Sequence, residues 1–281
     1  MIKCVKEKRV CMCKGIFITV EGGEGVGKTT AIEEICIWLY SLGMDFIKTR
    51  EPGGIPISES IRGVILDRKN TMMDGRTEAL LYAASRRQHL VEKVIPALND
   101  GKMVICDRFV DSSIAYQGHA RGIGMKEVET INAFAIDDCV PQLTILLDLV
   151  PEVGLARLNK DANREINRLD LEKLDFHTKV REGYNLLLEQ HPERIVLVNA
   201  NQEPEKVVED IKDIITKKFF IEERETHQCI FKWDKDCIDT NTDCARCTVR
   251  HKLCYKCLKK YPSQGCDSCI ANANPGLTLK K

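Results

Sequence analysis

The stretch EGGEGVGKTT, residues 21–30, limits what this chain can fold into more than any other feature of the sequence. It follows the pattern G-x-x-x-x-G-K-[ST], after a β-rich apolar run (GIFITV) and before a segment with apolar residues at helical spacing (AIEEICIWLY). In such a loop, backbone N–H groups converge on phosphate oxygens, the lysine neutralises them and the hydroxyl ligates Mg²⁺. A chance glycine-rich turn would not explain the flanking strand and helix. The expected phosphate-binding residues are Gly22, Gly25, Gly27, Lys28, Thr29 and Thr30.

Further apolar runs predict a parallel sheet. A strand is expected to include Phe46 and Ile47, and others to span 103–107, 143–149 and 194–200. Near-continuous apolar runs of this length suit strands that are buried on both faces. Between them, helical spacing predicts helices over 77–98, 125–138, 171–191 and 204–220. Strands that alternate with helices predict a doubly wound α/β domain.

Length and charge limit the classes that remain. With 281 residues, of which 43% are apolar, the chain has material for one full-sized core and a small appendage. The 42 basic and 42 acidic side chains cancel, so no overall field attracts the chain to nucleic acid or a membrane. No apolar run approaches the ~18 residues that cross a bilayer. The first fifteen residues lack the apolar core of a secretion signal, so we expect a cytoplasmic protein.

Eight of the 14 cysteines crowd the last fifth of the chain. We therefore divide the sequence into an N-terminal extension (1–14), an α/β domain (15–225) and a cysteine-rich module (226–281). Three CxxC pairs and two further thiolates suit two tetrahedral zinc sites, which would stabilise a segment too polar to form a core. Disulfides and an iron–sulfur cluster are the alternatives. The expected zinc ligands are Cys229, Cys237, Cys244, Cys247, Cys254, Cys257, Cys266 and Cys269.

Two interpretations fit the basic residues of this cysteine-rich module. Its stretch 246–260 carries six lysines and arginines, with Tyr255 among them and Tyr261 just beyond. Basic residues interleaved with aromatic ones are typical of nucleic-acid binding. A solvated surface on a docking or dimer-stabilising module fits the same residues and is the favoured interpretation.

Four further motifs narrow the function: TREPGG, EALLYAASRRQH, VICDRFVDSSIAYQG and NRLDLEKLDFHTKVREGY. In order and spacing they resemble the thymidylate kinase family, from about residue 15 to about residue 220. The resemblance implies the P-loop nucleoside monophosphate kinase fold, a five-stranded parallel sheet with helices on both faces. It also implies a homodimer, Mg²⁺ and the reaction of ATP with dTMP to give ADP and dTDP. The alternatives are a kinase for another deoxynucleoside monophosphate and a zinc-dependent binding protein with a vestigial kinase domain.

The resemblance assigns roles to several charged residues. Arg108 is expected to grip the acceptor phosphate, with Asp107 near the metal and the phosphates. A structural salt bridge is the alternative for this pair. Arg62 resembles a second phosphate-binding arginine, and Arg50 is expected to reach toward the phosphates as well. Two polyanions can react only if cations offset their repulsion and align them, which arginine does.

The same resemblance places the acceptor's base and sugar. Tyr82 would stack on thymine, where the family usually has phenylalanine, and Arg86 would bond a base carbonyl. These residues are four apart, so they share a helix face. Without the family, Tyr82 reads as a core aromatic. Four residues resemble the wall against the deoxyribose and base: Ser112, Ser113, Tyr116 and Gln117.

Glu24 stands in the middle of the phosphate loop, and by resemblance it accepts a hydrogen bond from the acceptor's 3′-hydroxyl. Some relatives follow this carboxylate with a catalytic arginine, but here the next residue is Gly25. The segment RLNKDANREINRLD resembles the lid of bacterial-type enzymes, whose arginine stabilises the transferring phosphoryl group. Its candidates are Arg157, Lys160, Arg164 and Arg168, with Arg164 first and Arg168 second. The alternative is a solvated basic helix-turn.

Overall fold

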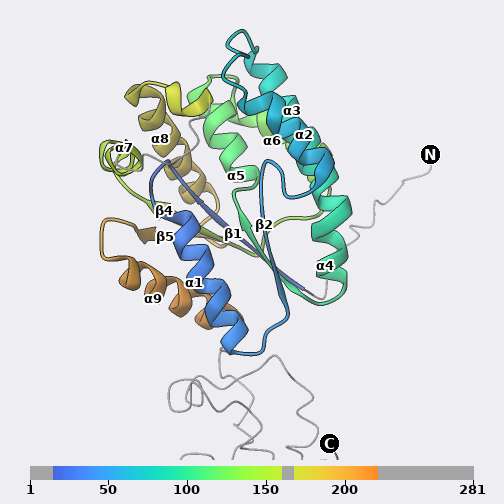
Figure 1. The fold of residues 1–281 in the computed structure, drawn as a ribbon, viewed down its shortest axis with the longest axis vertical. Coiled ribbons are helices and arrows are strands. Elements are labelled where there is room, and N and C mark those ends of the chain that lie inside the picture. Colours follow the sequence, from blue (N-terminus) through green and yellow to red (C-terminus); the bar gives the residue numbers. More distant parts are fainter. Residues whose placement is uncertain (1–14, 160–167, 221–281) are drawn as a thin grey trace, which may run out of the picture.

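The computed structural model describes residues 15–159 and 168–220 of the chain (Figure 1). The N-terminal extension, the candidates Lys160 and Arg164, and the cysteine-rich module lie outside these residues. The strands are β1 (Ile16–Gly22), β2 (Phe46–Arg50), β3 (Met103–Asp107), β4 (Leu143–Asp148) and β5 (Ile195–Asn199). The α-helices are α1 (Lys28–Ser41), α2 (Pro56–Leu66), α3 (Gly75–His89), α4 (Ile95–Asn99), α5 (Val110–Ser113), α6 (Met125–Ile136), α7 (Pro151–Asn159), α8 (Leu174–Gln190) and α9 (Pro204–Ile215). Shorter helical segments are η1 (Leu90–Val94), η2 (Ile114–Ala120), η3 (Arg168–Leu171) and η4 (Thr216–Phe220).

The five strands form one parallel sheet in the order β2-β3-β1-β4-β5. Strand β1 lies at the centre, between β3 and β4, so the loop that follows it opens at the middle of the sheet's carboxyl edge. The register pairs Val20 of β1 with Asp107 of β3. In open parallel sheets, ligands bind outside the carboxyl ends of the strands. The phosphate loop and the DRF motif therefore emerge side by side.

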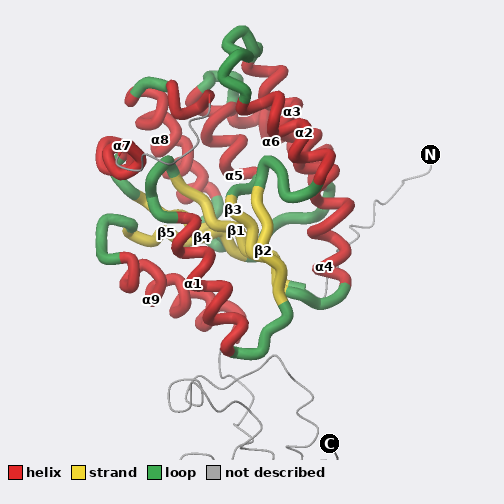
Figure 2. The backbone as a smooth tube through the Cα atoms, viewed as in Figure 1, coloured by secondary structure: helices red, strands yellow, loops and turns green. Residues whose placement is uncertain are grey.

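Each face of the sheet has its own apolar core. Residues of α1 and α9 pack on one face against Ile18 and Val20, whereas Phe17 points to the other face and packs against η1 and α4. Farther along that second face, α8 and η2 pack over β4 and β5. Figure 2 shows the strands between these helical layers. The predicted α/β domain with helices on both faces is confirmed.

The predicted strands agree with the structure to within a residue or two at most ends, although β2 runs on to Arg50. The helix predicted over 77–98 is α3, η1 and α4 in succession, and the one over 204–220 is α9 and η4. In the described part of the chain, the helical segments that were not predicted are α2, α5 with η2, α7 and η3. Among the described residues, no helix is long and apolar enough to cross a membrane.

Candidate active site

The phosphate loop turns sharply at the end of β1 and feeds α1. Gly25 and Gly27 have φ values of 69° and 95°, a left-handed conformation that glycine adopts without strain. Helix α1 begins at Lys28, whose Nζ donates to the carbonyls of Gly22 (3.1 Å) and Gly23 (2.7 Å). Burial, and then the nearby Arg108, lower the pKa of Lys28 to about 8. The charged form of an ammonium group with so little access to water is strongly stabilised when a polyanion binds beside it.

Gly25 is also fixed by close packing against α7. A Cβ atom on Gly25 would lie 2.0 Å from the carbonyl oxygen of Gly154, and one on Gly154 would lie 2.2 Å from the carbonyl oxygen of Glu24. Because the backbone of the phosphate loop is in direct contact with the backbone of α7, a side chain at position 25 would force the loop and the helix apart. The absence of an arginine at this position therefore has a steric reason in this chain.

Arg108 joins the phosphate loop to the pocket wall. It follows β3 with a φ of 67°, unusual for a residue other than glycine, and its backbone N–H donates to the carbonyl of Val20 at 3.0 Å. Its guanidinium donates to Glu24 Oε1 (2.7 Å), to the Gly22 carbonyl (3.1 Å) and to the Tyr116 hydroxyl (3.1 Å). The strained backbone thus aims a cation at the loop, as an acceptor-phosphate ligand requires.

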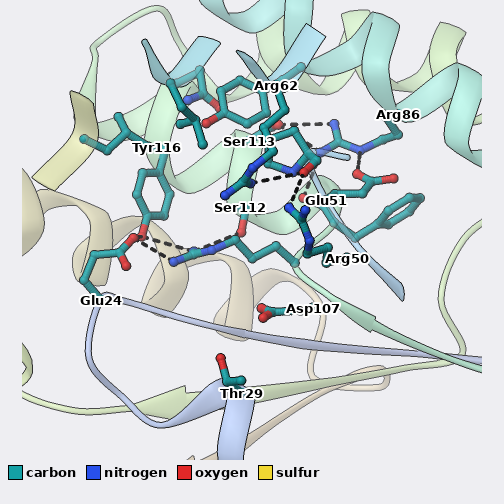
Figure 3. Close-up of a pocket in the computed structure, with 17 residues that line it drawn as sticks. Glu24, Thr29, Arg50, Glu51, Arg62, Arg86, Asp107, Ser112, Ser113 and Tyr116 are labelled. Carbon is teal, nitrogen blue, oxygen red and sulfur yellow. Dashed lines mark hydrogen bonds and ion pairs between the residues drawn. The ribbon is translucent and has the colours of Figure 1, made fainter. Parts of the chain in front are cut away.

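Glu24 is held as a carboxylate at the same point. Its Oε1 accepts from both Arg108 and the Tyr116 hydroxyl, the latter at 2.9 Å. Figure 3 shows Tyr116 and Glu24 pointing toward one another. Burial by itself would raise the pKa of Glu24, but Arg108 and Lys28 outweigh it and lower that pKa to about 2. The side chain is therefore an acceptor only, which suits the predicted contact with a sugar hydroxyl.

Asp107 and Thr29 offer oxygen ligands on one side of the pocket (Figure 3). Within the described part of the chain, Asp107 Oδ1 is buried and has no hydrogen-bond partner. An unsatisfied carboxylate oxygen and a hydroxyl that line the same pocket are the donor types that Mg²⁺ prefers, with water and substrate phosphates able to complete the shell. No group of three or more His, Cys, Asp or Glu residues gathers elsewhere in the described ranges to hold a metal by protein ligands alone.

These elements border a pocket of about 310 Å³ at the carboxyl edge of the sheet. It brings together all ten residues that the sequence analysis assigned to acceptor binding. The lining residues are Glu24, Thr29, Arg50, Glu51, Pro52, Arg62, Leu66, Tyr82, Arg86, Asp107, Arg108, Phe109, Ser112, Ser113, Tyr116, Gln117 and Leu169.

The arginines at the rim of the pocket differ from the one in its interior in exposure and in hydrogen bonding. At the rim, Arg50 donates to Glu59 at 2.8 Å, and Arg50 and Arg62 both donate to the Pro52 carbonyl. In the interior, Arg86 is 1% exposed and bonds Glu51 Oε2 at 2.7 Å. It also donates to the Phe109 carbonyl, Ser113 and Asn132. Arg86 is therefore a rigid part of the wall, whereas the rim arginines are more exposed.

Tyr82 lies one turn before Arg86 on α3, with its ring 9% exposed and lining the pocket. Burial raises the pKa of its phenol above the ordinary value, so the hydroxyl stays protonated. An amphipathic ring with its body buried and one edge on a cavity can stack on a base.

Three buried carboxylates that the sequence analysis did not single out support this wall. Glu21 accepts from Phe109 N (2.6 Å), Ser112 (2.5 Å) and Tyr184 (2.9 Å). Burial, and then Asp111, raise the pKa of Glu21 to about 7. Glu51 holds Arg86, and Glu78 holds Gln117. Each lies inside a quoted motif, and that is the only sequence signal that points to them.

The basic segment before α8 is described at its two ends only. Arg157 on α7 reaches the carbonyl of Ala200 after β5, at 3.4 Å. Arg168, the first residue of η3, is 9% exposed and pairs with Glu78, away from the phosphate loop. All eight cysteines that are predicted to bind zinc lie beyond Phe220, outside the described residues.

Comparison with known proteins gives one consistent result. A family model described as thymidylate kinase matches residues 20–211. A thymidylate kinase of Clostridium novyi is 62% identical over 204 residues, which cover 73% of this chain and all of the relative. A thymidylate kinase of Bacillus thuringiensis is 58% identical over 205 residues, covering 73% of this chain and 99% of the relative. The match to the family model ends before the cysteine-rich module begins.

Proposed function

Since this chain belongs to the thymidylate kinase family and phosphorylates dTMP with ATP, we propose how its residues divide that work. The phosphate loop, with Gly22, Gly25, Gly27, Lys28, Thr29 and Thr30, binds the phosphates of ATP. The pocket of about 310 Å³ beside it binds dTMP. The observation that supports this division most is Arg108, which contacts the loop carbonyl of Gly22 and the pocket residue Tyr116 with one guanidinium.

Arg108 binds the acceptor phosphate and holds it next to the γ-phosphoryl group. Phosphoryl transfer needs the attacking and leaving oxygens in line and their charge offset, and it needs little covalent chemistry from the protein. Lys28 offsets charge on the donor side and Arg108 on the acceptor side. Arg62 and Arg50 at the rim supply further charge to the acceptor, and Glu24 accepts from its 3′-hydroxyl.

The base is bound deeper in the pocket. Tyr82 stacks on thymine, and Arg86 donates to a base carbonyl in exchange for one of the two contacts that its guanidinium makes with Ser113. Ser112, Ser113, Tyr116 and Gln117 pack against the deoxyribose and base. Because Glu51 and Asn132 fix Arg86, this part of the pocket is preorganised rather than assembled on binding.

The family implies Mg²⁺, and Thr29 and Asp107 are the residues that would hold it. The ion supplies positive charge to the donor phosphates. The Thr29 hydroxyl lies at the N-terminal turn of α1, where anionic phosphate oxygens are also favoured.

Arg164 is our first choice for the cation that stabilises the transferring phosphoryl group. Gly25 cannot carry a side chain, Arg157 contacts Ala200 and Arg168 pairs with Glu78. Of the two candidates that remain, Lys160 and Arg164, only Arg164 carries a guanidinium, which fits phosphoryl oxygens in a two-pronged geometry. Changing Arg164 to alanine should lower kcat by about 100-fold or more and change the KM for dTMP little, because the contact is made mainly in the transition state. An unchanged kcat in steady-state assays would remove this role from Arg164.

We also infer that two copies of the chain associate. Helices α2, α3 and α6 pack side by side and expose large apolar side chains, including Leu80 (56% exposed) and Phe134 (91% exposed). A second copy is the occupant that the family suggests. Light scattering should give twice the chain mass, and Phe134→Glu should shift it to the mass of one chain.

The cysteine-rich module is proposed to be a separate zinc-binding unit. Its eight cysteines would supply two Cys₄ sites, with a folding free energy on the order of 10 kcal/mol for each zinc. Elemental analysis of protein purified without added metal should find about two zinc ions per chain. A truncated chain that ends near Glu225 should contain none and still phosphorylate dTMP. A full-length protein with an ordered module and no metal would contradict this proposal.

A further inference from the structure

Glu78 lies behind the wall of the dTMP pocket, on α3, and is 1% exposed. It does not line the pocket itself. Its Oε1 accepts from Gln117 Nε2 at 2.7 Å, and its Oε2 pairs with Arg168. A second arginine, Arg121, lies 3.6 Å from the same Oε2 and is itself 2.7 Å from Glu172. A carboxylate buried this deeply is stable as an anion only with such partners.

Arg168 is committed to this cluster through the Nε–Nη2 edge of its guanidinium. Its Nε donates to the carbonyl of Ile65, near the end of α2, at 3.0 Å, and its Nη2 donates to Glu78. The side chain is 9% exposed. Before Arg168 could reach a phosphoryl group, it would have to break its ion pair with the buried Glu78, which would then keep only Gln117 and the more distant Arg121, and this loss is disfavoured.

The partners of Glu78 are placed where they shape the pocket. Gln117 lines the pocket from η2, and Leu169, next to Arg168, lines it from η3. Tyr82 lies one turn after Glu78 on the same helix, so it shares that helix face. One carboxylate thus connects three segments that each contribute a side chain to the same cavity.

We propose that Glu78 and Arg168 are a positioning pair for the acceptor nucleotide, which fixes Gln117 and Leu169 against the dTMP pocket. Arg168 acts through these neighbours and does not touch the transferring phosphoryl group. Among the described residues, neither Glu78 nor Arg168 forms a hydrogen bond or ion pair with the phosphate loop. The pair therefore sets the affinity for dTMP and leaves ATP binding and the chemical step nearly unchanged. The inference rests on the assignment of this pocket to dTMP.

Steady-state kinetics of Glu78→Gln and Arg168→Met separate positioning from catalysis. Both variants should raise the KM for dTMP by about 10-fold or more, with kcat within about 3-fold and the KM for ATP unchanged, because a uniform binding contribution is lost. The double variant should be little worse than the poorer single one, since the two side chains form one pair. Arg168→Lys, which keeps the charge, should recover part of the affinity.

The matched control is Glu92→Gln, an exposed glutamate on η1, the helical segment that continues α3, and it should have wild-type kinetics. A 100-fold fall in kcat of Arg168→Met with an unchanged KM for dTMP would contradict the proposal, because it would place this guanidinium on the transition state. So would additive losses in the double variant. If the wild-type protein used another nucleotide in preference to dTMP, the pocket assignment itself would be wrong, which the same assays distinguish.

Discussion

Replacing Lys28 by alanine should lower kcat by about a thousandfold or more, because the donor phosphates lose the cation that offsets their charge during transfer. The fold should survive. Lys28 is buried with a pKa lowered to about 8, which means that the native structure disfavours its charged form relative to water. Its two hydrogen bonds go to loop carbonyls and not to the core. The measurement is kcat by coupled assay, with the thermal unfolding temperature as the test of folding.

Lys48→Ala is the control for this variant. Lys48 lies on β2, about half exposed, and its ion pair with Glu33 at 3.6 Å is of the surface type that contributes little. It should have wild-type kinetics. A Lys28→Ala protein that kept a near-normal rate would refute the assignment of residues 21–30 as the phosphate-binding loop.

Arg108→Ala should lower kcat/KM for dTMP by a comparable factor, about a thousandfold, through the loss of both grip and alignment of the acceptor phosphate. A second effect follows from the structure. Arg108 is the main cause of the low pKa of Glu24, so its removal should raise that pKa toward the ordinary value. The Glu24 carboxylate would then be a weaker hydrogen-bond acceptor for the sugar hydroxyl. The expected kinetic signature is a loss that falls on dTMP more than on ATP.

Arg108→Lys tests the geometry separately from the charge. One ammonium group cannot contact Glu24, Tyr116 and a phosphate with the fixed fork of a guanidinium, so this variant should recover only part of the loss. Arg68→Ala, an exposed arginine just after α2, serves as the control. Normal dTMP kinetics in Arg108→Ala would mean that another residue binds the acceptor phosphate.

The sheet could be predicted from the sequence because its strands are nearly continuous apolar runs, which parallel strands buried on both faces require. Helix α2 could have been found as well: Pro56 stands at its first position, and Ile57, Ile61, Val64 and Ile65 follow helical spacing. Segment α5 with η2 contains serines and a glycine that are typical of a loop, and its packing against α8 and α6 favours the helical conformation.

The partners of the buried carboxylates Glu51 and Glu78 could not be predicted from the sequence. Glu51 meets Arg86 across 35 residues of chain, and Glu78 meets Arg168 across 90. A motif can indicate that a position matters, but the partner depends on which elements the fold brings together. The steric role of Gly25 is of the same kind, because it depends on Gly154 of α7 and not on the loop pattern. The residues that we propose to contact substrate could thus be named from the motifs, whereas the residues that hold them in place could not.

The central claim is that this chain is a dTMP kinase whose acceptor is bound in the pocket beside the phosphate loop. The most direct test is an ADP-release assay with Mg-ATP across dTMP, dUMP, UMP, dCMP and dGMP at equal concentrations. The account predicts that dTMP has the highest kcat/KM and that Lys28→Ala abolishes ADP release with every acceptor. If dTMP proved no better than UMP or dCMP, the claim would be contradicted.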